Sequence, residues 1–434
     1  MMYINGIIAE YNPFHNGHEY MIKKIKEDTG ADYIIAVMSG AFTQRGIPGI
    51  ADKFTRAKMA VACGIDAVFE LPVRFATSNA EVFAMGAVSF FHALSCVDYL
   101  AFGSECGSLS DFMEASEFLL QEPEEFQTAI KQYLKQGLSY PKAFSLAAGQ
   151  SGSSNAPSTS REQTKTSAPF SSGLLAHPNN VLGLEYVKAL KKLSSTIRPH
   201  TISRTGTGYH DDHASYSKEA DTLIASASAI RTALGSRTGN IAMAQPLLPP
   251  EAYRVFAENY GTMGPASLDD FSLLLSVRLA GETRESLSSY LDVPAELADR
   301  ILSFRETYMT FSELISAIKH KQYTYARINR ALLHILLNLK DTGEKLSATP
   351  SKPLVPYGRL LAMKKNSSSV IKEIKAHSQI PVITKPAEAK KVLSGEALAL
   401  FQEDVSAADL YFRMLSFKYG TKFLHDVQRT IELI

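Results

Sequence analysis

Hydrophobic and polar positions in the first third of the chain follow a repeating order of short apolar runs and helix-compatible stretches. β-Branched or aliphatic runs stand at Ile4–Ala9, Tyr33–Met38, Ala67–Leu71 and Tyr99–Phe102. Helix-compatible stretches lie between them, such as Glu19–Glu27, Lys53–Cys63 and Ala80–Leu94. Strands that recur at roughly 30-residue spacing with helices between them predict βαβ units and a parallel sheet. The loops after the strands should then meet at one edge, where ligands bind in open α/β sheets.

The apolar pattern becomes helical from about Pro246 onward. A 3.6-residue period runs through Leu268–Leu279, Val293–Phe304, Phe311–Lys319 and Arg327–Leu339, as in amphipathic helices. Elsewhere, helices are predicted at Leu182–Leu193, Ala225–Leu234 and Ala407–Tyr419, and strands at Thr201–Arg204 and Pro381–Thr384. The sequence therefore predicts an α/β fold, with a Rossmann-like parallel-sheet domain over residues 1–240 and a mostly helical domain over residues 241–434.

A segment dense in Ser, Thr, Gly and Pro interrupts the first predicted domain at about residues 149–172. This composition favours a flexible surface loop. The functional alternative is a mobile lid over a site.

Composition and charge describe an ordinary globular chain. The 434 residues are 45% hydrophobic and 21% charged, with a formal net charge of +1, which excludes a disordered tail protein and one that is basic throughout. The three cysteines form no CxxC pair, so we expect neither a zinc knuckle nor a disulfide framework. Free thiols suit a reducing cytoplasm. No run of 18 apolar residues occurs, so no membrane partner is expected.

The strongest chemical signal directly follows the first predicted strand. The residues Tyr11-Asn12-Pro13-Phe14-His15-Asn16-Gly17-His18 place a His-x-Gly-His motif at the start of a predicted helix. Gly17 lets a ligand approach the backbone closely, and the first turn of a helix offers free N–H groups to an anion. His15 and His18 can donate hydrogen bonds to phosphate oxygens and to charge that develops in a transition state. The alternative is a turn with two surface histidines.

Further candidates follow the second and fourth strands. Gln44-Arg45-Gly46 offers polar and cationic groups in a loop at the same edge of the sheet. Lys53 and Arg56 share a helix face, where they either bind one anion or form a solvated face. Gly103 closes a strand and suits close contact with a nucleotide.

Two later segments add groups that suit a nucleotide. Of Asn179 and Asn180, ordinary helix capping is expected to explain at least one, and the other is left to contact a base or ribose. Ser228 and Arg231 stand one turn apart at the start of a short helix, where a hydroxyl, a helix dipole and a planar cation suit a polyphosphate. Arg204 ends a strand-like run. Since no Ser-His-Asp triad or metal-ligand spacing competes for this place, the set predicts a nucleotide site at which an α-phosphate is attacked.

Several of these segments carry a family resemblance. His15-Asn16-Gly17-His18 resembles the HIGH-type motif of the nucleotidyltransferase superfamily, and Ser228-Ala229-Ile230-Arg231 resembles its second phosphate-binding motif. More closely, AEYNPFHNGH, VMSGAFTQRGIP, KFTRAKMA, ELPVRFATSNAEVFAMGAV and NNVLGLEYVKAL are similar to the bacterial tRNA(Met) cytidine acetate ligase family. Gly208-Tyr209-His210-Asp211 and Ile224–Leu234 extend the match. These segments cover most of residues 1–240.

The resemblance implies a two-step ligase reaction. Acetate attacks the α-phosphate of ATP, and the wobble cytidine of elongator tRNA(Met) then takes the acetyl group to give N(4)-acetylcytidine, with AMP and pyrophosphate as products. Mg²⁺ would accompany the triphosphate, with no dedicated metal cage. The implied catalytic residues are His15 and His18, and the implied ATP contacts are Ile7, Ile8, Ala9, Glu10, Tyr11, Asn12, Pro13, Phe14, His15, Asn16, Gly17, His18, Glu19, Tyr20, Gly103, Asn179 in preference to Asn180, Arg204, Ser228 and Arg231.

The second half of the chain offers a candidate surface for the tRNA. Residues 301–400 contain 16 Lys+Arg and 7 Asp+Glu, a marked local excess in a nearly neutral chain. Within them, Lys319, Lys321 and Arg327 alternate with Tyr323 and Tyr325, and phosphate contact combined with base stacking is the usual physics of RNA binding. The alternative is a solvated basic face with half-buried tyrosines.

Two other functions compete with the ligase. A small-molecule adenylyltransferase that uses ATP would need the same nucleotide site, but it gives no reason for a basic helical half. An RNA-binding protein on a retired nucleotide fold would have no reason to keep His15, Gly17, His18, Arg204 and Arg231 together.

Overall fold

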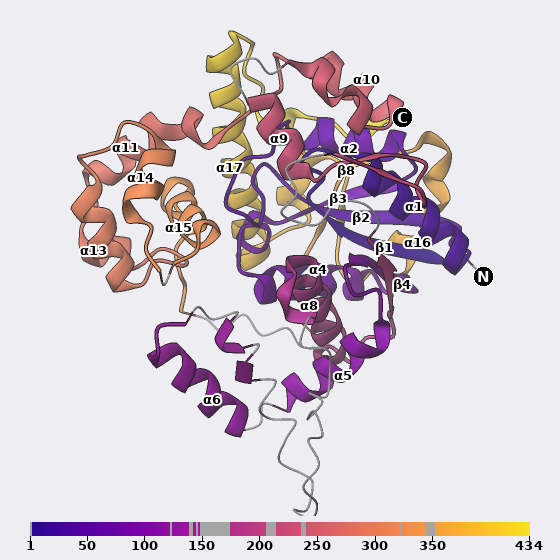
Figure 1. Cartoon of the computed structure of the whole chain (residues 1–434). Coiled ribbons are helices and arrows are strands. Elements are labelled where there is room, and N and C mark those ends of the chain that lie inside the picture. Colours follow the sequence, from indigo (N-terminus) through magenta and orange to yellow (C-terminus); the bar gives the residue numbers. More distant parts are fainter. Residues whose placement is uncertain are drawn as a thin grey trace, which may run out of the picture.

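The computed structural model describes residues 2–121, 124–138, 142–144, 146–147, 174–204, 214–235, 240–321, 323–343 and 352–434, and the fold is given for these residues (Figure 1). The Ser-rich segment at 149–172 and the segment 208–211 lie outside them.

A mostly parallel sheet lies at the centre of the molecule. In the described part of the chain its order is β10-β8-β3-β2-β1-β4-β5, with β9 beside β8. Strands β1 to β5 run parallel to one another, which confirms the predicted parallel sheet. The strands are β1 (Ile4–Ala9), β2 (Tyr33–Ser39), β3 (Ala67–Leu71), β4 (Tyr99–Ser104), β5 (Arg198–Ser203), β8 (Gly358–Met363), β9 (Val382–Ile383) and β10 (Glu432–Leu433), and a separate hairpin pairs β6 (Ser215–Ser217) with β7 (Thr222–Ile224).

Helices cover both faces of the sheet, which explains why strands β1 to β4 are mostly apolar. In β2, Ile34 and Met38 enter one hydrophobic core while Ile35 and Val37 enter the other, because successive side chains point to opposite faces. One face is covered by α1 (Asn16–Thr29), α2 (Lys53–Ala62), α9 (Ala227–Gly235) and α10 (Pro250–Asn259), and the other by α4 (Ala80–Leu94), α5 (Leu109–Leu120), α8 (Pro178–Lys192) and α16 (Ser368–His377) (Figure 1).

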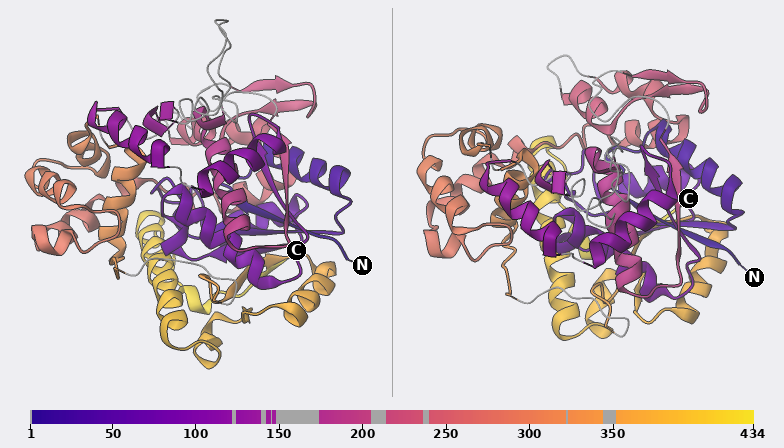
Figure 2. Two further views of the ribbon diagram at one scale, coloured as in Figure 1. Left: turned by 90° about the horizontal axis from the view of Figure 1, so that it is seen from below. Right: turned by 60° about the horizontal axis from the view of Figure 1, so that its bottom comes forward.

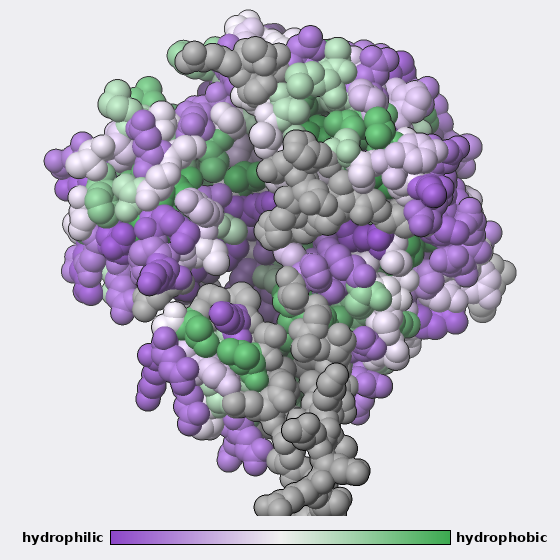
Figure 3. Space-filling model, viewed as in Figure 1, coloured by the Kyte–Doolittle hydropathy of each residue, from purple (hydrophilic) through white to green (hydrophobic). Residues whose placement is uncertain are grey.

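A group of helices stands to one side of the sheet, and all of its members except α12 match the four predicted amphipathic segments. They are η3 (Leu268–Phe271), α11 (Ser272–Ala280), α12 (Arg284–Leu287), α13 (Ala295–Phe304), α14 (Phe311–Ile318) and α15 (Tyr325–Leu337). The long helix α17 (Gly395–Tyr419) runs between this group and the sheet (Figures 1 and 2). In the space-filling view, the helical group presents mostly hydrophilic side chains with small hydrophobic areas between them (Figure 3).

Shorter elements complete the description. They are α3 (Val73–Ala76), α6 (Glu124–Lys135), η1 (Leu174–Ala176), η2 (Ile241–Leu247), η4 (Lys365–Ser367), η5 (Pro386–Lys391) and η6 (Asp426–Gln428). None of the helices that the structure describes combines the length and the apolar character that crossing a membrane requires.

The C-terminal part of the chain returns to the sheet, which the sequence pattern did not predict beyond the short strand at Pro381–Thr384. Strand β8 lies antiparallel to β3, and β9 and β10 lie parallel to β8. Residues from both sides of position 240 therefore share one sheet. The division into domains 1–240 and 241–434 stays a prediction.

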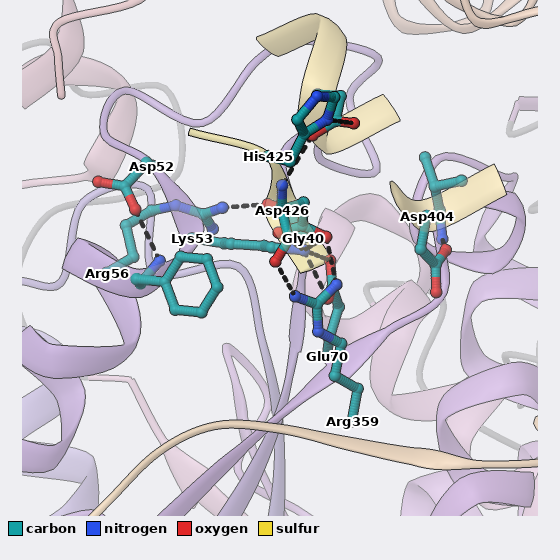
Figure 4. Close-up of polar contacts among 12 residues, drawn as sticks. Gly40, Asp52, Lys53, Arg56, Glu70, Arg359, Asp404, His425 and Asp426 are labelled. Carbon is teal, nitrogen blue, oxygen red and sulfur yellow. Dashed lines mark hydrogen bonds and ion pairs between the residues drawn. The ribbon is translucent and has the colours of Figure 1, made fainter. Parts of the chain in front are cut away.

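Four buried charges join this returning segment to the core of the sheet (Figure 4). Nζ of Lys53 lies 2.7 Å from Glu70 and 3.1 Å from Asp426, and the guanidinium of Arg359 pairs with the same two carboxylates. Burial opposes ionisation of Asp426, but Lys53 and Arg359 outweigh it, so its pKa lies below the ordinary range. The two positive and two negative groups compensate one another in a place where any one alone would be costly.

Neither sequence interpretation of Lys53 and Arg56 is correct. Both side chains are buried, at 1% and 0% exposure, so they form no solvated face, and their partners are protein groups rather than an external anion. Arg56 donates to backbone carbonyls at the ends of two strands: Nη1 lies 2.7 Å from the oxygen of Glu10 and 3.1 Å from that of Ser39. It therefore fixes the two loops that follow β1 and β2.

Candidate functional site

A cavity of about 620 Å³ opens at the carboxyl ends of the parallel strands. Its walls come from the segment after β1, the loop after β2, the end of β4, the start of α8 and the start of α9, and from the first turns of α15. This is the edge at which the strand order of the sheet predicts a ligand.

Two aromatic side chains anchor the turn between β1 and α1. Tyr11 and Phe14 are 2% and 0% exposed and join the hydrophobic core beneath the cavity. Asn12 ties this turn to the next loop, because its Oδ1 accepts a hydrogen bond of 2.6 Å from the backbone N–H of Ile50 and its Nδ2 donates to the carbonyl of Pro48 at 3.4 Å. The turn is thus held from both sides, and helix α1 begins at a fixed place.

The two histidines of the motif stack at the start of α1. Their ring centroids are 3.7 Å apart with an interplanar angle of 27°, and both side chains line the cavity. The backbone N–H of His15 donates to Nδ1 of His18 at 3.2 Å. Since that nitrogen accepts a hydrogen bond, the proton of a neutral His18 lies on Nε2, which is then a donor.

Burial keeps both imidazoles neutral. It is the main reason that the pKa of His15 falls to about 3, and the nearby positive charges of Arg204 and Arg231 lower it further. The pKa of His18 also lies well below its ordinary value, because of burial first and then of His15 and Arg204. The alternative of two surface histidines in a turn is therefore wrong. Each neutral ring can donate one N–H to an oxygen in the cavity without itself carrying charge.

Arginine side chains face the same region. Arg231 donates from Nη1 to the carbonyl of Asn12 at 2.7 Å and from Nη2 to Oγ of Ser228 at 3.0 Å. The same hydroxyl also accepts from Nη1 of Arg45 at 3.4 Å. Arg204, at the end of β5, lies 3.9 Å from the carboxylate of Glu105. Two guanidinium groups thus meet at the hydroxyl of Ser228, and the charge of Arg204 acts on both imidazoles. Such a group of planar cations suits a polyphosphate.

The two adjacent asparagines have different surroundings. Asn180 is 1% exposed, and its Oδ1 accepts hydrogen bonds from the backbone N–H groups of Glu105 and Cys106 at 2.9 and 3.3 Å. Asn179 lines the cavity and donates from Nδ2 to Glu105 at 2.6 Å. The expectation that helix capping explains one of them is wrong, because α8 starts after His177, whose side chain makes no cap hydrogen bond.

Most of the sequence-predicted ATP contacts line the cavity. They are Ile7, Ile8, Ala9, Glu10, Tyr11, Asn12, His15, His18, Gly103, Asn179, Arg204 and Ser228. The remainder are Pro13, Phe14, Asn16, Gly17, Glu19, Tyr20 and Arg231, which are not among the lining residues. In α1 the helical period turns Glu19 toward Lys23, 3.0 Å away, and the amide of Asn16 donates to the carbonyl of Leu223 at 2.8 Å.

The packing of the His15 ring explains why a glycine stands at position 17. A Cβ atom at this position would lie 3.1 Å from Cε1 of His15. The glycine therefore leaves room for the imidazole ring that covers the first turn of the helix.

Sequence reasoning left several lining residues without a role. Phe83, Leu182 and Tyr186 supply an apolar part of the wall, and Thr324, Ala326 and Arg330 come from the start of α15. Apolar positions of α4 and α8 carry no signal that separates a cavity wall from a core. The basic and aromatic stretch around the start of α15 is predicted to bind RNA, but the sequence does not show that it adjoins the cavity.

The predicted basic surface lies beside this wall. We use the term basic surface for Lys319, Lys321 and Arg327. Nζ of Lys319 lies 5.4 Å from the ring of Tyr325, and the guanidinium of Arg327 lies 4.8 Å from the ring of Tyr323. Tyr325 is 58% exposed and Tyr323 is 5% exposed, so only the former offers a ring for stacking. RNA binding here stays a prediction.

A resident metal centre finds no support in the described part of the chain. No group of three or more His, Cys, Asp or Glu side chains lies there in an arrangement that would hold a metal ion.

Comparisons with known proteins agree on one family. The family model described as HIGH Nucleotidyl Transferase matches residues 2–424. The tRNA(Met) cytidine acetate ligase of Clostridium perfringens (strain SM101 / Type A) is 38% identical over 427 residues, which cover 98% of each chain. That of Thermoanaerobacter sp. (strain X514) is 38% identical over 431 residues, 98% of this chain and 99% of the relative.

Solved structures give the same result at lower identity. The crystal structure of Thermotoga maritima TmcAL bound with alpha-thio ATP superposes with a TM-score of 0.84 at 26% identity, and the apo form superposes with a TM-score of 0.86 at 26% identity. Each superposition covers 100% of both chains.

Proposed function

Because the chain belongs to the HIGH nucleotidyl transferase family, together with relatives that are tRNA(Met) cytidine acetate ligases, we propose that it is an ATP-dependent ligase that acetylates the wobble cytidine of elongator tRNA(Met). The observation that carries this proposal is the pair of stacked, neutral histidines that face a cavity beside Arg45, Arg204 and Ser228.

In the first step a carboxylate oxygen of acetate attacks the α-phosphorus of ATP. The new P–O bond forms as the bond to the β-phosphate oxygen breaks, and the products are acetyl-adenylate and pyrophosphate. Negative charge grows on the departing β-phosphate oxygen. Neutral imidazole donors at His15 and His18 stabilise this charge, and they need no proton transfer to do so.

The arginines and the helix start hold the leaving group. Ser228 lies in the first turn of α9, so its hydroxyl and the free N–H groups of this turn face the anion together. Arg231 is oriented by its hydrogen bond to the carbonyl of Asn12. It thereby connects the pyrophosphate end of the site to the turn that carries the histidines.

The rest of the nucleotide is assigned to the central part of the cavity. Gly103 and Asn179 line it beside the apolar side chains of Phe102 and Tyr186, which suit an adenine ring and its ribose. The positive charge of Arg204 is assigned to compensate the negative charge of the α-phosphate. The described residues offer no metal cage, and Mg²⁺ that accompanies the triphosphate would offset part of its negative charge.

In the second step the exocyclic N4 of cytidine attacks the acetyl carbonyl carbon. The C–N bond forms, the bond from the carbonyl carbon to the phosphate oxygen breaks, AMP leaves, and the amine loses one proton to water. The basic surface at Lys319, Lys321 and Arg327 adjoins the cavity through Thr324 and Ala326 and is assigned to the tRNA.

Nucleoside mass spectrometry tests the proposal. Unmodified tRNA(Met) is incubated with the protein, ATP and isotopically labelled acetate, and digestion should yield labelled N(4)-acetylcytidine together with AMP and pyrophosphate. A reaction without acetate should yield no modified nucleoside. Acetate-independent transfer of AMP to a small molecule would instead support the small-molecule adenylyltransferase, which the relatives do not favour.

A further inference from the structure

One wall of the cavity takes no part in the assignment of ATP above. All the residues assigned to ATP lie between positions 7 and 231, whereas Thr324, Ala326 and Arg330 reach the same cavity from the start of α15. This wall lies between the nucleotide residues and the basic surface, where a second substrate has to enter.

Arg330 is the charged group of this wall, and it is held in place. Its residue is 9% exposed, and its Nε donates to Oδ2 of Asp292 at 3.2 Å. No other guanidinium nitrogen of Arg330 has a hydrogen-bond partner among the residues that the structure describes. A guanidinium fixed by one carboxylate, with donors left over beside a cavity, is preorganised to bind a pair of acceptor atoms.

The wall is fixed relative to the ATP residues. Nδ2 of Asn329 donates to the carbonyl of Arg45 at 3.3 Å. A Cβ atom on Gly46 would lie 2.4 Å from the backbone nitrogen of Arg330, so helix and loop are in direct contact there. Arg45 in turn reaches Oγ of Ser228. The distance between Arg330 and the phosphate end of the site is therefore set by packed backbone rather than by a flexible connection.

We propose that Arg330 binds the target nucleotide of the RNA substrate and holds it for attack on the acyl-adenylate. This inference rests on the proposed function. The O2 and N3 atoms of cytosine, and the phosphate next to the target nucleotide, share the acceptor chemistry that a guanidinium takes. Binding through either leaves the N4 amine of the base free to react. Asp292 is a positioning residue, because it acts by orienting Arg330.

Two activities are measured for each variant. One is acetate-dependent exchange of pyrophosphate into ATP without tRNA, and the other is acetyl transfer to tRNA(Met) as kcat/KM for the tRNA. In Arg330→Gln the ratio of transfer to exchange should fall at least about tenfold, the effect expected when charged hydrogen bonds are lost. Arg330→Lys should recover only part of it. The matched control is Arg284→Gln, which removes an exposed pair with Asp299 outside the cavity wall and should leave both activities unchanged.

A substrate variant separates the two sources of acceptor atoms. An anticodon stem-loop with an uncharged methylphosphonate next to the target cytidine is used with both proteins. If Arg330 binds the phosphate, Arg330→Gln should have no further effect on this substrate. If it binds the base edge, the loss should persist. Both results support the proposal.

The experiments distinguish a failure of the Arg330 proposal from a failure of the proposed function. An active wild-type protein whose Arg330→Gln variant loses exchange and transfer equally, or loses neither, overturns the role of Arg330 while the ligase proposal stands. A wild-type protein without acetate-dependent exchange overturns the proposed function itself. If Arg330→Gln does not fold, the variant Asp292→Asn is measured instead. It keeps the guanidinium but removes the negative charge that orients it, so the KM for tRNA should rise, and an unchanged KM would contradict the proposal.

Discussion

The imidazole rings of His15 and His18 stack with their centroids 3.7 Å apart, and the backbone N–H of His15 donates to Nδ1 of His18. The backbone at the start of α1 thus sets the tautomer of His18, and the two rings pack as one unit. Because two charged imidazoliums in this place would repel each other and the neighbouring arginines, the arrangement favours neutral donors.

Replacing either histidine with alanine should slow the first step. A donor aimed at developing charge contributes on the order of 2–4 kcal/mol to transition-state stabilisation, so acetate-dependent pyrophosphate exchange should fall by roughly two orders of magnitude in each variant. His377→Ala, at an exposed position of α16, is the control and should exchange normally. Near wild-type exchange in His15→Ala or His18→Ala would contradict the role assigned to that ring.

The free energy of unfolding should fall on acidification, because His15 is buried in its neutral form. The pKa of His15 is lowered to about 3 in the native state, against an ordinary value near 6.5. At a pH between these two values, His15 therefore binds a proton in the unfolded chain but not in the native chain. The stabilisation is fully present above pH 6.5 and is lost as the pH falls from 6.5 toward 3, by about 2 kcal/mol at pH 5. Urea denaturation of wild type and His15→Gln at pH 7.5 and 5.0 checks this, and a loss of equal size in both proteins would contradict it.

Asp404 should give a pH dependence of the opposite sign. Burial, aided by Glu70, raises the pKa of Asp404 to about 8, so the native state keeps a proton that the unfolded carboxyl releases above about pH 4. This stabilisation is present below pH 4 and is lost as the pH rises to 8. Between pH 6 and 8.5 the wild type should lose about 2.5 kcal/mol from this group, and Asp404→Asn should not. The exposed Asp299→Asn serves as the control, with the wild-type slope.

The buried charges around Lys53 should behave as one compensated set. Lys53→Met leaves Glu70 and Asp426 with Arg359 as their only partner in the set, and the free energy of unfolding should fall by about 3–5 kcal/mol. Lys53→Met combined with Glu70→Gln should cost less than the sum of the two single changes. Lys23→Met, in an exposed pair with Glu19, should change stability by no more than about 0.5 kcal/mol. Strict additivity of the two buried changes would show that the groups do not compensate each other.

The sequence predicted the parallel sheet because each of its first four strands is a short apolar run between helix-compatible stretches. It also predicted the cavity edge, because the motif around His15 and His18 directly follows a strand. The spacing of apolar residues and the place of a motif after a strand are local properties of the sequence. They were sufficient to predict the sheet and the edge at which the cavity lies.

Non-local pairing explains what was missed. Strand β8 is as apolar as the other strands, but its partner β3 lies about 290 residues earlier, and the intervening helices give no sign of the return. Lys53 and Arg56 have the spacing of a surface pair, yet Glu70, Asp426 and the carbonyls of β1 and β2 enclose them. The place of Arg330 in the wall of the cavity that the histidines line likewise depends on how α15 packs on the Arg45–Gly46 loop.

Reversing the basic surface should separate RNA binding from nucleotide binding. In the triple variant Lys319→Glu, Lys321→Glu and Arg327→Glu, the affinity for tRNA(Met) should fall, and the slope of log Kd against log salt should decrease by about 2, as expected for three lost phosphate contacts. ATP affinity should not change, because none of the three side chains lines the cavity. The control reverses three exposed lysines of equal total charge, Lys372, Lys375 and Lys390, and should keep the wild-type slope. If both triple variants weaken tRNA binding equally, the effect comes from net charge alone, and an affinity that stays at the wild-type value across the salt series would remove this surface from the path of the tRNA.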